Sequence, residues 1–312
     1  MRNDVVTVFG GSGFLGRYVV RRLANKGARV RVICRYPHKA LHLKPMGEVG
    51  QITLERGDVA NRDDLSTFIE GSRHVVNLIG ILFEKGDQRF EVIQAQTPAR
   101  IAAAATAARV ERLVQLSAIG ADPESPAAYG RTKAAGEAAV REAFPAATIL
   151  RPSVVFGPED DFFNRFGQMA QISPFLPLID GGETRFQPVY VDDVAKAVVL
   201  GLSENFTVGE TFELGGPDVY TFRELLQYLL EVLHRRRLLL NLPANIATIQ
   251  ARFMEFLPKP PLTRDQIALL ASDNVVSPGA KGFAELGIEP TPLEVIVPSY
   301  VQRYAKRQPR AA

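Results

Sequence analysis

The chain has 312 residues, enough for one doubly wound domain and a smaller second lobe. Hydrophobic residues make up 46% of the sequence and charged residues 23%, fractions that exclude a globally disordered chain. The formal net charge of +3 permits an anionic partner, but no nucleic-acid-binding motif accompanies it, so we expect no nucleic acid as a partner.

Short apolar runs alternate with amphipathic segments through the first half of the chain, the pattern of a parallel sheet wrapped by helices. The strands expected there are Val5–Phe9, Ala28–Cys34, Ile52–Glu55, Val75–Ile79, Leu113–Leu116 and Thr148–Leu150. The helices expected between them are Phe14–Lys26, Asp63–Ile69, Phe90–Arg109 and Tyr129–Ala143.

After Arg151, prolines interrupt this rhythm, and the expected strands Phe186–Tyr190 and Thr211–Leu214 are isolated. The helices expected in this half are Asp192–Leu202, Phe222–Leu233, Ala244–Leu257 and Leu293–Tyr304. The sequence therefore predicts an α/β protein, with a Rossmann doubly wound parallel sheet in residues 1–155. A smaller C-terminal α/β lobe follows in residues 156–312, interleaved with the sheet edge around residues 186–215.

The sequence also indicates where the protein resides. Cys34 is the only cysteine, so no internal disulfide can form. We recognise no secretory signal and no apolar run of the roughly 18 residues that a membrane span needs. No group of His, Cys and carboxylate residues resembles a metal site. We expect a cytoplasmic protein, with peripheral attachment to the cytoplasmic face of the inner membrane as the alternative.

Glycines at positions 10, 13 and 16 lie between the first strand and the first helix. Gly10 permits a tight turn, Gly13 lets the backbone approach a pyrophosphate, and Gly16 lets the helix pack closely. The N–H groups at the start of the helix favour phosphates, although an ordinary glycine-rich turn is the alternative. We expect contacts to a dinucleotide from Gly10, Ser12, Gly13, Phe14, Leu15 and Gly16.

The residue after the second strand indicates which dinucleotide is bound. NAD-binding sites usually place a carboxylate there to hold the ribose hydroxyls, and this chain has Arg35. A guanidinium can hold a 2′-phosphate through paired charge-assisted hydrogen bonds. We therefore expect NADP(H) rather than NAD(H), with an ordinary surface arginine as the alternative interpretation.

Tyr129 and Lys133 form a Tyr-x-x-x-Lys pair on an expected helix. Residues four positions apart share a helix face, so phenol and ammonium can approach the same ligand. The lysine charge would lower the tyrosine pKa toward a range useful for acid–base catalysis. By itself the pair is weak evidence; its place before the sixth strand of a Rossmann pattern favours nucleotide contact.

The glycine spacing, together with the Tyr129–Lys133 pair, resembles the extended and atypical short-chain dehydrogenase/reductases. The resemblance implies that Asp58 and Val59 lie beside the adenine, although Asp58 is equally an ordinary turn former. It implies that the backbone of Leu78, Ile79 and Gly80 passes beneath the cofactor. It also implies that the segment containing Pro152 and Val155 lies beside the nicotinamide.

Two hydroxyl residues usually close the fifth strand in this family, and here the strand ends in Ser117-Ala118. If the second position polarises the substrate carbonyl, Ala118 has removed the donor; if the register shifts by one, Ser117 retains it. Losing such a donor costs on the order of a hundredfold in rate. Catalysis by Tyr129, Lys133 and Ser117 and a structural role for the nucleotide both stay open.

Over its whole length the chain resembles one branch of the family, the 39-kDa accessory subunit of respiratory complex I in its bacterial form. The segments that carry this resemblance are Tyr129–Lys133, Phe186–Tyr190, Leu262–Gln266 and Asp273–Val276. It implies a structurally bound nucleotide, with complex I subunits near the membrane arm as partners. The alternatives are a soluble reductase, epimerase or dehydratase acting on a small carbonyl or nucleotide-sugar substrate, and a redox-sensing regulator.

One expected helix also suggests a surface contact. Ala244–Leu257 carries Ile246, Ile249, Phe253 and Leu257 along one stripe, after three consecutive arginines at positions 235–237. Such a helix fits a partner subunit or peripheral contact with a membrane. The alternative is a helix that packs only on its own lobe.

Overall fold

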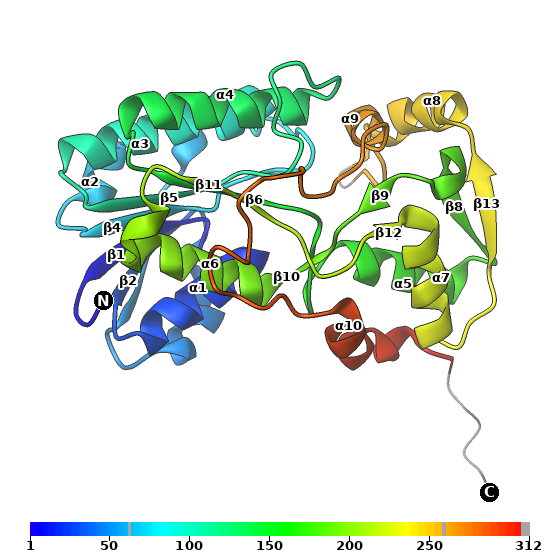
Figure 1. The fold of residues 1–312 in the computed structure, drawn as a ribbon, viewed down its shortest axis with the longest axis horizontal. Coiled ribbons are helices and arrows are strands. Elements are labelled where there is room, and N and C mark those ends of the chain that lie inside the picture. The colour runs from blue at the N-terminus through cyan, green and yellow to red at the C-terminus, as the bar shows by residue number, and fades with distance from the viewer. Residues whose placement is uncertain (62–63, 258–259, 307–312) are drawn as a thin grey trace, which may run out of the picture. The chain divides into compact units, whose positions relative to one another are not determined.

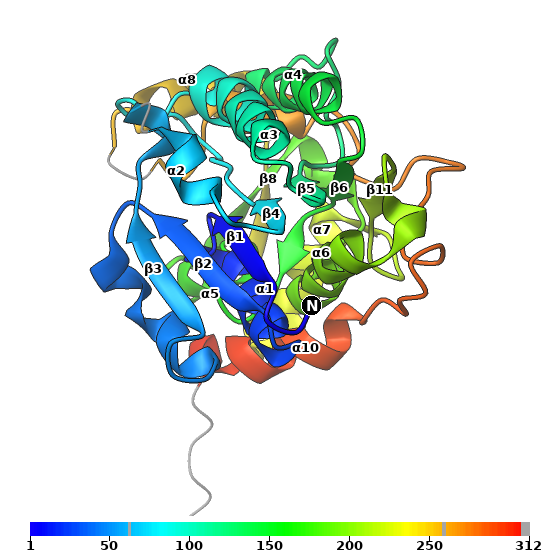
Figure 2. The same ribbon diagram turned by 90° about the vertical axis from the view of Figure 1, so that its left-hand side faces the viewer.

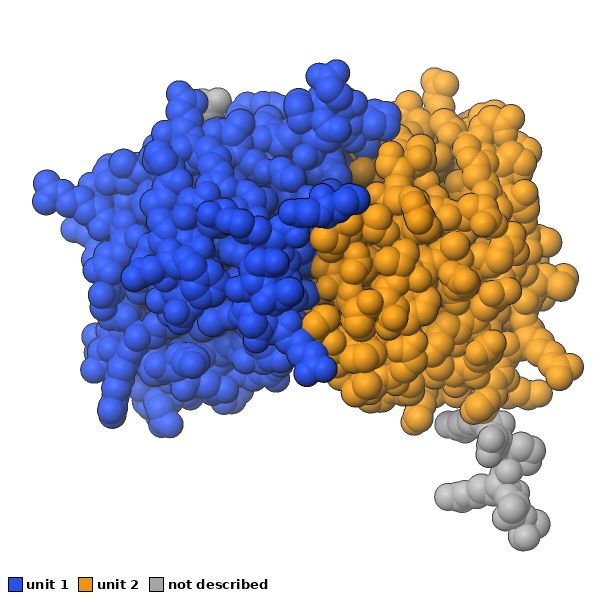
Figure 3. All heavy atoms as spheres, in the orientation of Figure 1, with its two compact units in different colours: residues 1–152, 191–214, 277–289 blue, residues 153–190, 215–276, 290–312 orange. Residues whose placement is uncertain are grey.

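The computed structural model describes residues 1–61, 64–257 and 260–306 (Figure 1). The chain divides into two compact units, which Figure 3 colours separately. Unit 1 comprises Met1–Pro152, Val191–Leu214 and Ser277–Glu289. Unit 2 comprises Ser153–Tyr190, Gly215–Val276 and Pro290–Ala312.

Unit 1 is built on a seven-stranded sheet with the strand order β11-β6-β5-β4-β1-β2-β3. Every pairing in it is parallel, and Val8 of the central strand β1 lies between Val32 and Val76. The strands are β1 (Val5–Phe9), β2 (Arg29–Cys34), β3 (Ile52–Arg56), β4 (His74–Asn77), β5 (Arg112–Leu116), β6 (Thr148–Pro152) and β11 (Thr211–Leu214). The run from β3 to β6 is the Rossmann order, so the predicted doubly wound parallel sheet is confirmed.

Helices cover both faces of this sheet (Figure 2). Helices α1 (Phe14–Asn25) and α6 (Val191–Ser203) pack together on one face, and α2 (Leu65–Ile69), α3 (Thr97–Ala107) and α4 (Ala128–Ala143) lie on the other. The strands read as continuous apolar runs because both faces are buried. The core beneath α2, α3 and α4 includes Phe9, Ile33, Val75, Ile101 and Leu113.

The expected helix Phe90–Arg109 differs in the structure, where a π-helical segment, η3 (Glu91–Gln96), precedes α3. Proline explains the difference, because Pro98 has no N–H to donate to the carbonyl of Gln94 four residues earlier. That carbonyl faces Gly136 on α4, where a Cβ atom would lie 2.0 Å from it. A glycine at 136 therefore allows the two segments to pack closely.

Two expected strands also differ. Thr211–Leu214 is not isolated, because as β11 it pairs with β6 and extends the main sheet. Phe186–Tyr190 is two short strands, β9 (Arg185–Phe186) and β10 (Val189–Tyr190), with Pro188 between them. The expected first residue of one helix, Asp63, lies outside the described residues; α2 begins at Leu65, where the Asp64 carboxylate accepts from the Ser66 N–H at 3.0 Å.

Unit 2 has three two-stranded sheets, β10-β7, β12-β9 and β13-β8. Its remaining strands are β7 (Val155–Phe156), β8 (Phe175–Ile179), β12 (Tyr220–Thr221) and β13 (Leu238–Leu242). Its helices are α5 (Phe162–Ile172), α7 (Phe222–Val232), α8 (Ala244–Met254), α9 (Arg264–Leu269) and α10 (Leu293–Val301). Phe156, Phe163, Leu226, Leu229 and Val297 are among the buried residues of its core.

Candidate functional site

The loop between β1 and α1 depends on glycine at two positions. Gly10 has a φ of +79°, a conformation that L-residues rarely adopt. At Gly16, an added Cβ would lie 2.4 Å from the Gly10 carbonyl oxygen and 2.6 Å from Gly11 Cα. The expected close packing at Gly16 is therefore a contact with the loop itself. Together the two glycines bring the first turn of α1 against the end of β1.

Gly13 is the N-cap residue of α1, and no side chain caps this helix. Intrahelical bonding begins with the Arg17 N–H, which donates to the Gly13 carbonyl at 3.2 Å. Ser12, Gly13 and Phe14 are accessible, whereas the side chain of Leu15 is buried, so Leu15 can meet a ligand only through its backbone. N–H groups at an uncapped helix start carry partial positive charge and favour a phosphate.

A cavity of about 600 Å³ lies at the carboxyl ends of β2 and β3. It is lined by Arg35, Tyr36, Arg56, Gly57, Asp58, Asp64, Thr67 and Phe68. Arg35 and Arg56 are both exposed, and they lie at the ends of adjacent strands, because Arg56 of β3 pairs with Cys34, the residue before Arg35. No carboxylate among the described residues forms an ion pair with either guanidinium. Two cations thus face one cavity.

Sequence reasoning missed Arg56. The expected third strand ended at Glu55, one residue short of the observed end of β3. Only the pairing of β3 with β2 places Arg56 beside the residue that precedes Arg35. A signal was present in the sequence, because a basic residue directly follows the expected end of each of these two strands.

The two predicted adenine contacts have different surroundings. Asp58 lines the cavity, and its Oδ1 atom accepts from the Ala60 N–H at 3.1 Å, so the carboxylate also shapes the turn. The side chain of Val59 is buried in the core beneath α2 and α3. The Val59 carbonyl accepts a hydrogen bond from Arg100 at 2.9 Å. Only the backbone of Val59 remains available to a ligand.

Several other predicted residues lie close together at the carboxyl ends of β4 and β5. A Cβ on Gly10 would lie 3.2 Å from the Ile79 nitrogen and from the Leu78 carbonyl carbon, so this backbone passes directly beside the loop. A Cβ on Gly80 would lie 3.3 Å from Lys133 Nζ. Lys133 Nζ donates to the Leu116 carbonyl at 3.5 Å, next to Ser117.

The ammonium of Lys133 is buried in this cluster. The side chain is only 5% exposed, and its nitrogen lies 5.8 Å from the centre of the Tyr129 ring. Burial disfavours the charged form and lowers the pKa of Lys133 to about 8. Tyr129 is half-buried and contacts Phe90 edge-on, with 6.0 Å between ring centres.

Ser117 is 3% exposed, and its buried hydroxyl has no hydrogen-bond partner among the described residues. A buried polar atom without a partner usually indicates a ligand or a water at that place. Pro152 ends β6, and its carbonyl accepts from the Ile119 N–H at 3.0 Å. Val155 belongs to unit 2, where it pairs with Val189.

These features match the parts of a dinucleotide in chemistry. The uncapped helix suits a pyrophosphate, the two arginines suit a further phosphate, and Lys133 with Ser117 suits ribose hydroxyls and a carboxamide. Within the part of the chain that the structure describes, no three His, Cys, Asp or Glu residues gather as metal ligands would.

Lys133→Met is expected to stabilise the ligand-free protein at pH 7 by as much as about 3 kcal/mol, because it removes a buried charge. Between pH 8 and about 10.4, the ordinary lysine value, the unfolded chain binds more protons than the folded one. The free energy of unfolding of the parent protein therefore rises with pH in this window, and the gain from the substitution shrinks. Urea unfolding of both proteins at pH 7, 8 and 9.5 measures this, and a gain independent of pH would contradict it.

Comparison with known proteins identifies the family. The model of the NAD dependent epimerase/dehydratase family matches residues 6–215. NADH dehydrogenase [ubiquinone] 1 alpha subcomplex subunit 9, mitochondrial, of Arabidopsis thaliana is 37% identical, covering 98% of this chain and 79% of that protein. The protein of the same name from Mus musculus is 36% identical, covering 93% of this chain and 78% of that one.

A solved structure shares the fold. MoeE5 in complex with UDP-glucuronic acid and NAD superposes with a TM-score of 0.67 at 19% identity, covering 88% of this chain and 95% of that one. The resemblance drawn from the sequence is confirmed by these matches. The chain belongs to the NAD dependent epimerase/dehydratase family and, within it, is a relative of subunit 9 of the mitochondrial NADH dehydrogenase alpha subcomplex.

Proposed function

We propose that this protein is an NADP(H)-binding accessory subunit of respiratory complex I, in which the nucleotide is held as a structural cofactor. The observation that carries the choice of NADP(H) is the pair of exposed guanidinium groups, Arg35 and Arg56, facing one cavity at the ends of β2 and β3. Among the residues that the structure describes, neither arginine has a carboxylate partner in an ion pair, so both can attract a 2′-phosphate, whereas NAD-binding sites place a carboxylate there.

The remaining contacts follow the length of the dinucleotide. The backbone of Gly10–Gly16 holds the pyrophosphate at the start of α1, and Asp58 accepts from the adenine amino group. Lys133 donates to the nicotinamide ribose, and Ser117 supplies a hydroxyl beside it. When bound, the nicotinamide supplies hydride-transfer chemistry. A ligand held at a hundred times its Kd stabilises the fold by about 2.7 kcal/mol.

The role in complex I is supported by the two named relatives. Both are subunits of NADH dehydrogenase, and the sequence similarity to each extends over most of this chain. An exposed apolar face on α8 gives the chain a surface for such a partner. This α8 apolar face consists of Ile246, Ile249 and Phe253 on the helix and of Phe256 and Leu257 directly after it; Phe253 is 70% and Phe256 87% exposed. The opposite side of the helix buries Ala247 and Ala251. Within the described residues, no helix is both long and apolar enough to cross a bilayer.

The α8 apolar face docks on complex I near its membrane arm, which places the protein on the cytoplasmic face of the inner membrane in a bacterium. Exposed apolar patches of this kind mark interaction sites. Replacing Ile249 and Phe253 by glutamate puts two charges on the face, and burying either against a partner is costly. We expect the double variant to lose at least about tenfold in co-purification with complex I while it keeps its nucleotide.

The matched control is Thr248→Glu, which adds a charge to the same helix at an exposed position outside the face. It should co-purify with complex I as the unmodified protein does. Flotation with anionic vesicles distinguishes docking on a complex I subunit from direct binding to lipid. A face that binds lipid directly would bring the protein to vesicles without any other subunit. Normal co-purification of the double variant would contradict the docking role.

Native mass spectrometry of the protein isolated from membranes tests the proposal as a whole. NADP(H) should remain bound, and complex I subunits should appear in the same assemblies. Recovery with NAD(H) or with no dinucleotide would refute the cofactor assignment, and recovery without any complex I subunit would refute the partnership.

A second candidate function is a reductase, epimerase or dehydratase. It is favoured by one observation, the pairing of Tyr129 with a lysine whose pKa is lowered to about 8. Ala118 counts against it, because a methyl group cannot donate to a developing oxyanion. Oxidation of NADPH with a panel of carbonyl or nucleotide-sugar substrates, lost in Tyr129→Phe, would favour this second function.

A further inference from the structure

Helix α4 carries a lysine and a glutamate one turn apart that do not pair with each other. Lys133 and Glu137 are four residues apart, and the two residues are 5% and 7% exposed. A cation and a carboxylate with this spacing ordinarily attract each other. Among the described residues, however, no carboxylate forms an ion pair with Lys133, whose hydrogen bond goes to the Leu116 carbonyl.

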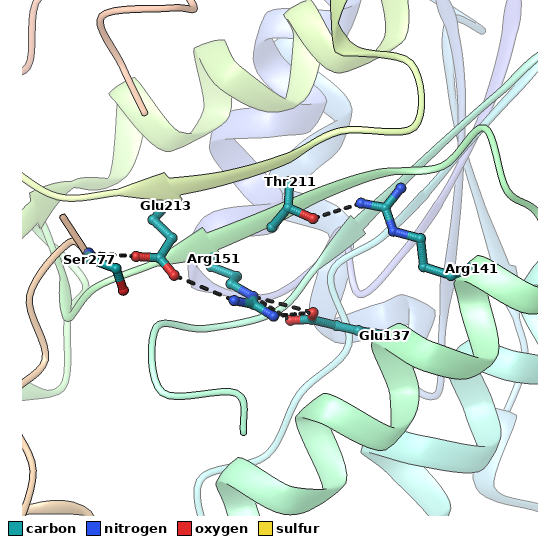
Figure 4. A network of polar contacts seen from close by, with 6 residues as sticks. All are labelled: Glu137, Arg141, Arg151, Thr211, Glu213 and Ser277. Atoms are coloured by element: carbon teal, nitrogen blue, oxygen red, sulfur yellow. Dashed lines mark hydrogen bonds and ion pairs between the residues drawn. The ribbon is translucent and has the colours of Figure 1, made fainter. Parts of the chain in front are cut away.

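Arg151 on β6 occupies the carboxylate instead. Its guanidinium donates to both oxygens of Glu137, with distances of 2.9 Å from Nε to Oε1 and 2.7 Å from Nη2 to Oε2 (Figure 4). Paired hydrogen bonds of this kind are among the strongest between side chains and fix the geometry of both partners. The carboxylate of Glu137 is therefore directed at β6.

The arginine is itself fixed from the other side. Glu213 lies beside Arg151 in the register of β11 with β6, and its Oε1 atom is 3.4 Å from Nη1 of Arg151. The second oxygen of Glu213 accepts from the Ser277 N–H at 2.8 Å. Arg141, the other cation in Figure 4, donates to Thr211 at 2.6 Å and to the Gly209 carbonyl. Arg151 thus lies between two carboxylates, with its closer, paired contacts on Glu137.

We infer that Arg151 is a positioning residue of the dinucleotide site, because by engaging Glu137 it leaves the Lys133 ammonium available to neutral ribose hydroxyls. A carboxylate within reach would compete strongly with hydroxyl oxygens for that ammonium, since charge-assisted hydrogen bonds are roughly twice as strong as neutral ones. The inference rests on the proposed dinucleotide site. It adds Arg151 to the residues on which nucleotide binding depends, although Arg151 itself would not touch the nucleotide.

Arg151→Met releases Glu137, which should then pair with Lys133. We expect the affinity for NADPH, measured by calorimetry on the full chain, to fall about tenfold. Glu137→Gln alone should change the affinity less than threefold, because it creates no competitor. Adding Glu137→Gln to Arg151→Met should restore the affinity to within threefold of the unmodified protein, since the competing carboxylate is then gone. A merely structural role of Arg151 would give no such rescue.

Arg151→Lys is a second variant for the case that the methionine variant folds poorly, because it keeps a cation beside Glu137. Its affinity for NADPH should fall less than threefold. Unchanged affinity of a folded Arg151→Met protein would overturn the inference, and so would a double variant as weak as the single one. Failure of the proposed function looks different, because the unmodified protein would then bind neither NADPH nor NADH.

Discussion

Gly13→Asp should reduce the affinity for both NADPH and NADH by at least about a hundredfold, or about 2.7 kcal/mol, while the protein stays folded. Gly13 has an ordinary φ of −78°, and the nearest atom to an added Cβ would be the Gly10 carbonyl oxygen at 3.3 Å, so a side chain requires that carbonyl to shift by only a few tenths of an ångström. The new carboxylate would accept from the free N–H groups of α1 and repel the pyrophosphate that needs them.

The same substitution should leave thermal stability equal or slightly higher, because aspartate is a favourable N-cap residue and α1 has no side-chain cap. Binding and stability thus move in different directions, and calorimetric titration with thermal unfolding of the ligand-free protein measures both. Gly13→Ala is the control, since it adds the Cβ without charge, and it should lose only a few-fold in affinity. Retention of normal affinity in Gly13→Asp would remove the loop from the site.

Arg35→Glu should reduce the ratio of NADPH affinity to NADH affinity by about a hundredfold. In the proposed site the guanidinium would form charge-assisted hydrogen bonds to the 2′-phosphate, and the substituted carboxylate would repel it while accepting from an unphosphorylated ribose. Arg56→Glu should act in the same direction, because the two side chains face the same cavity. Calorimetry with each cofactor measures the ratio.

Arg29→Glu is the matched control for this charge reversal. Arg29 is exposed at the amino end of β2, whereas Arg35 directly follows its carboxyl end, so the change in net charge is the same but far from the cavity. This variant should keep the ratio within about twofold. A preference of the unmodified protein for NADH would contradict the role given to Arg35 and Arg56 and leave the fold assignment untouched.

The first 150 residues could be predicted well because the signals there are local. Apolar strands bounded by glycine, and the four-residue spacing of Tyr129 and Lys133, do not depend on distant parts of the chain. The strand bounds from Val5 to Pro152 agree with the structure to within two residues. One exception is the π-helical segment η3, whose form depends on Pro98 and on a contact with Gly136 across the layer, and another is the 3-10 helical segment η1 (Pro37–Met46), which was not expected.

Features that depend on long-range pairing could not be predicted. The side-by-side pairing of Arg151 and Glu213 exists only because β11 adds to the sheet edge, 62 residues along the chain. In unit 2, β8 pairs in parallel with β13, and neither strand was expected. For β8 the reason is Pro174 and Pro177, because prolines before and within a segment argue against a strand. Arg56 was missed for a related reason. Its pairing with Cys34 on β2 is what brings it beside Arg35 at the cavity.

Unit 1 is assembled from three separate stretches of chain, and this has a consequence for biosynthesis. When residues 1–152 leave the ribosome, β6 is an open sheet edge, because its neighbour β11 begins at Thr211. The face beside α1 also lacks its cover, since α6 begins at Val191. An exposed parallel edge is a template for unwanted association. The nascent protein therefore depends on uninterrupted synthesis through residue 214, and shortening the gene to residues 1–152 would yield an aggregating fragment.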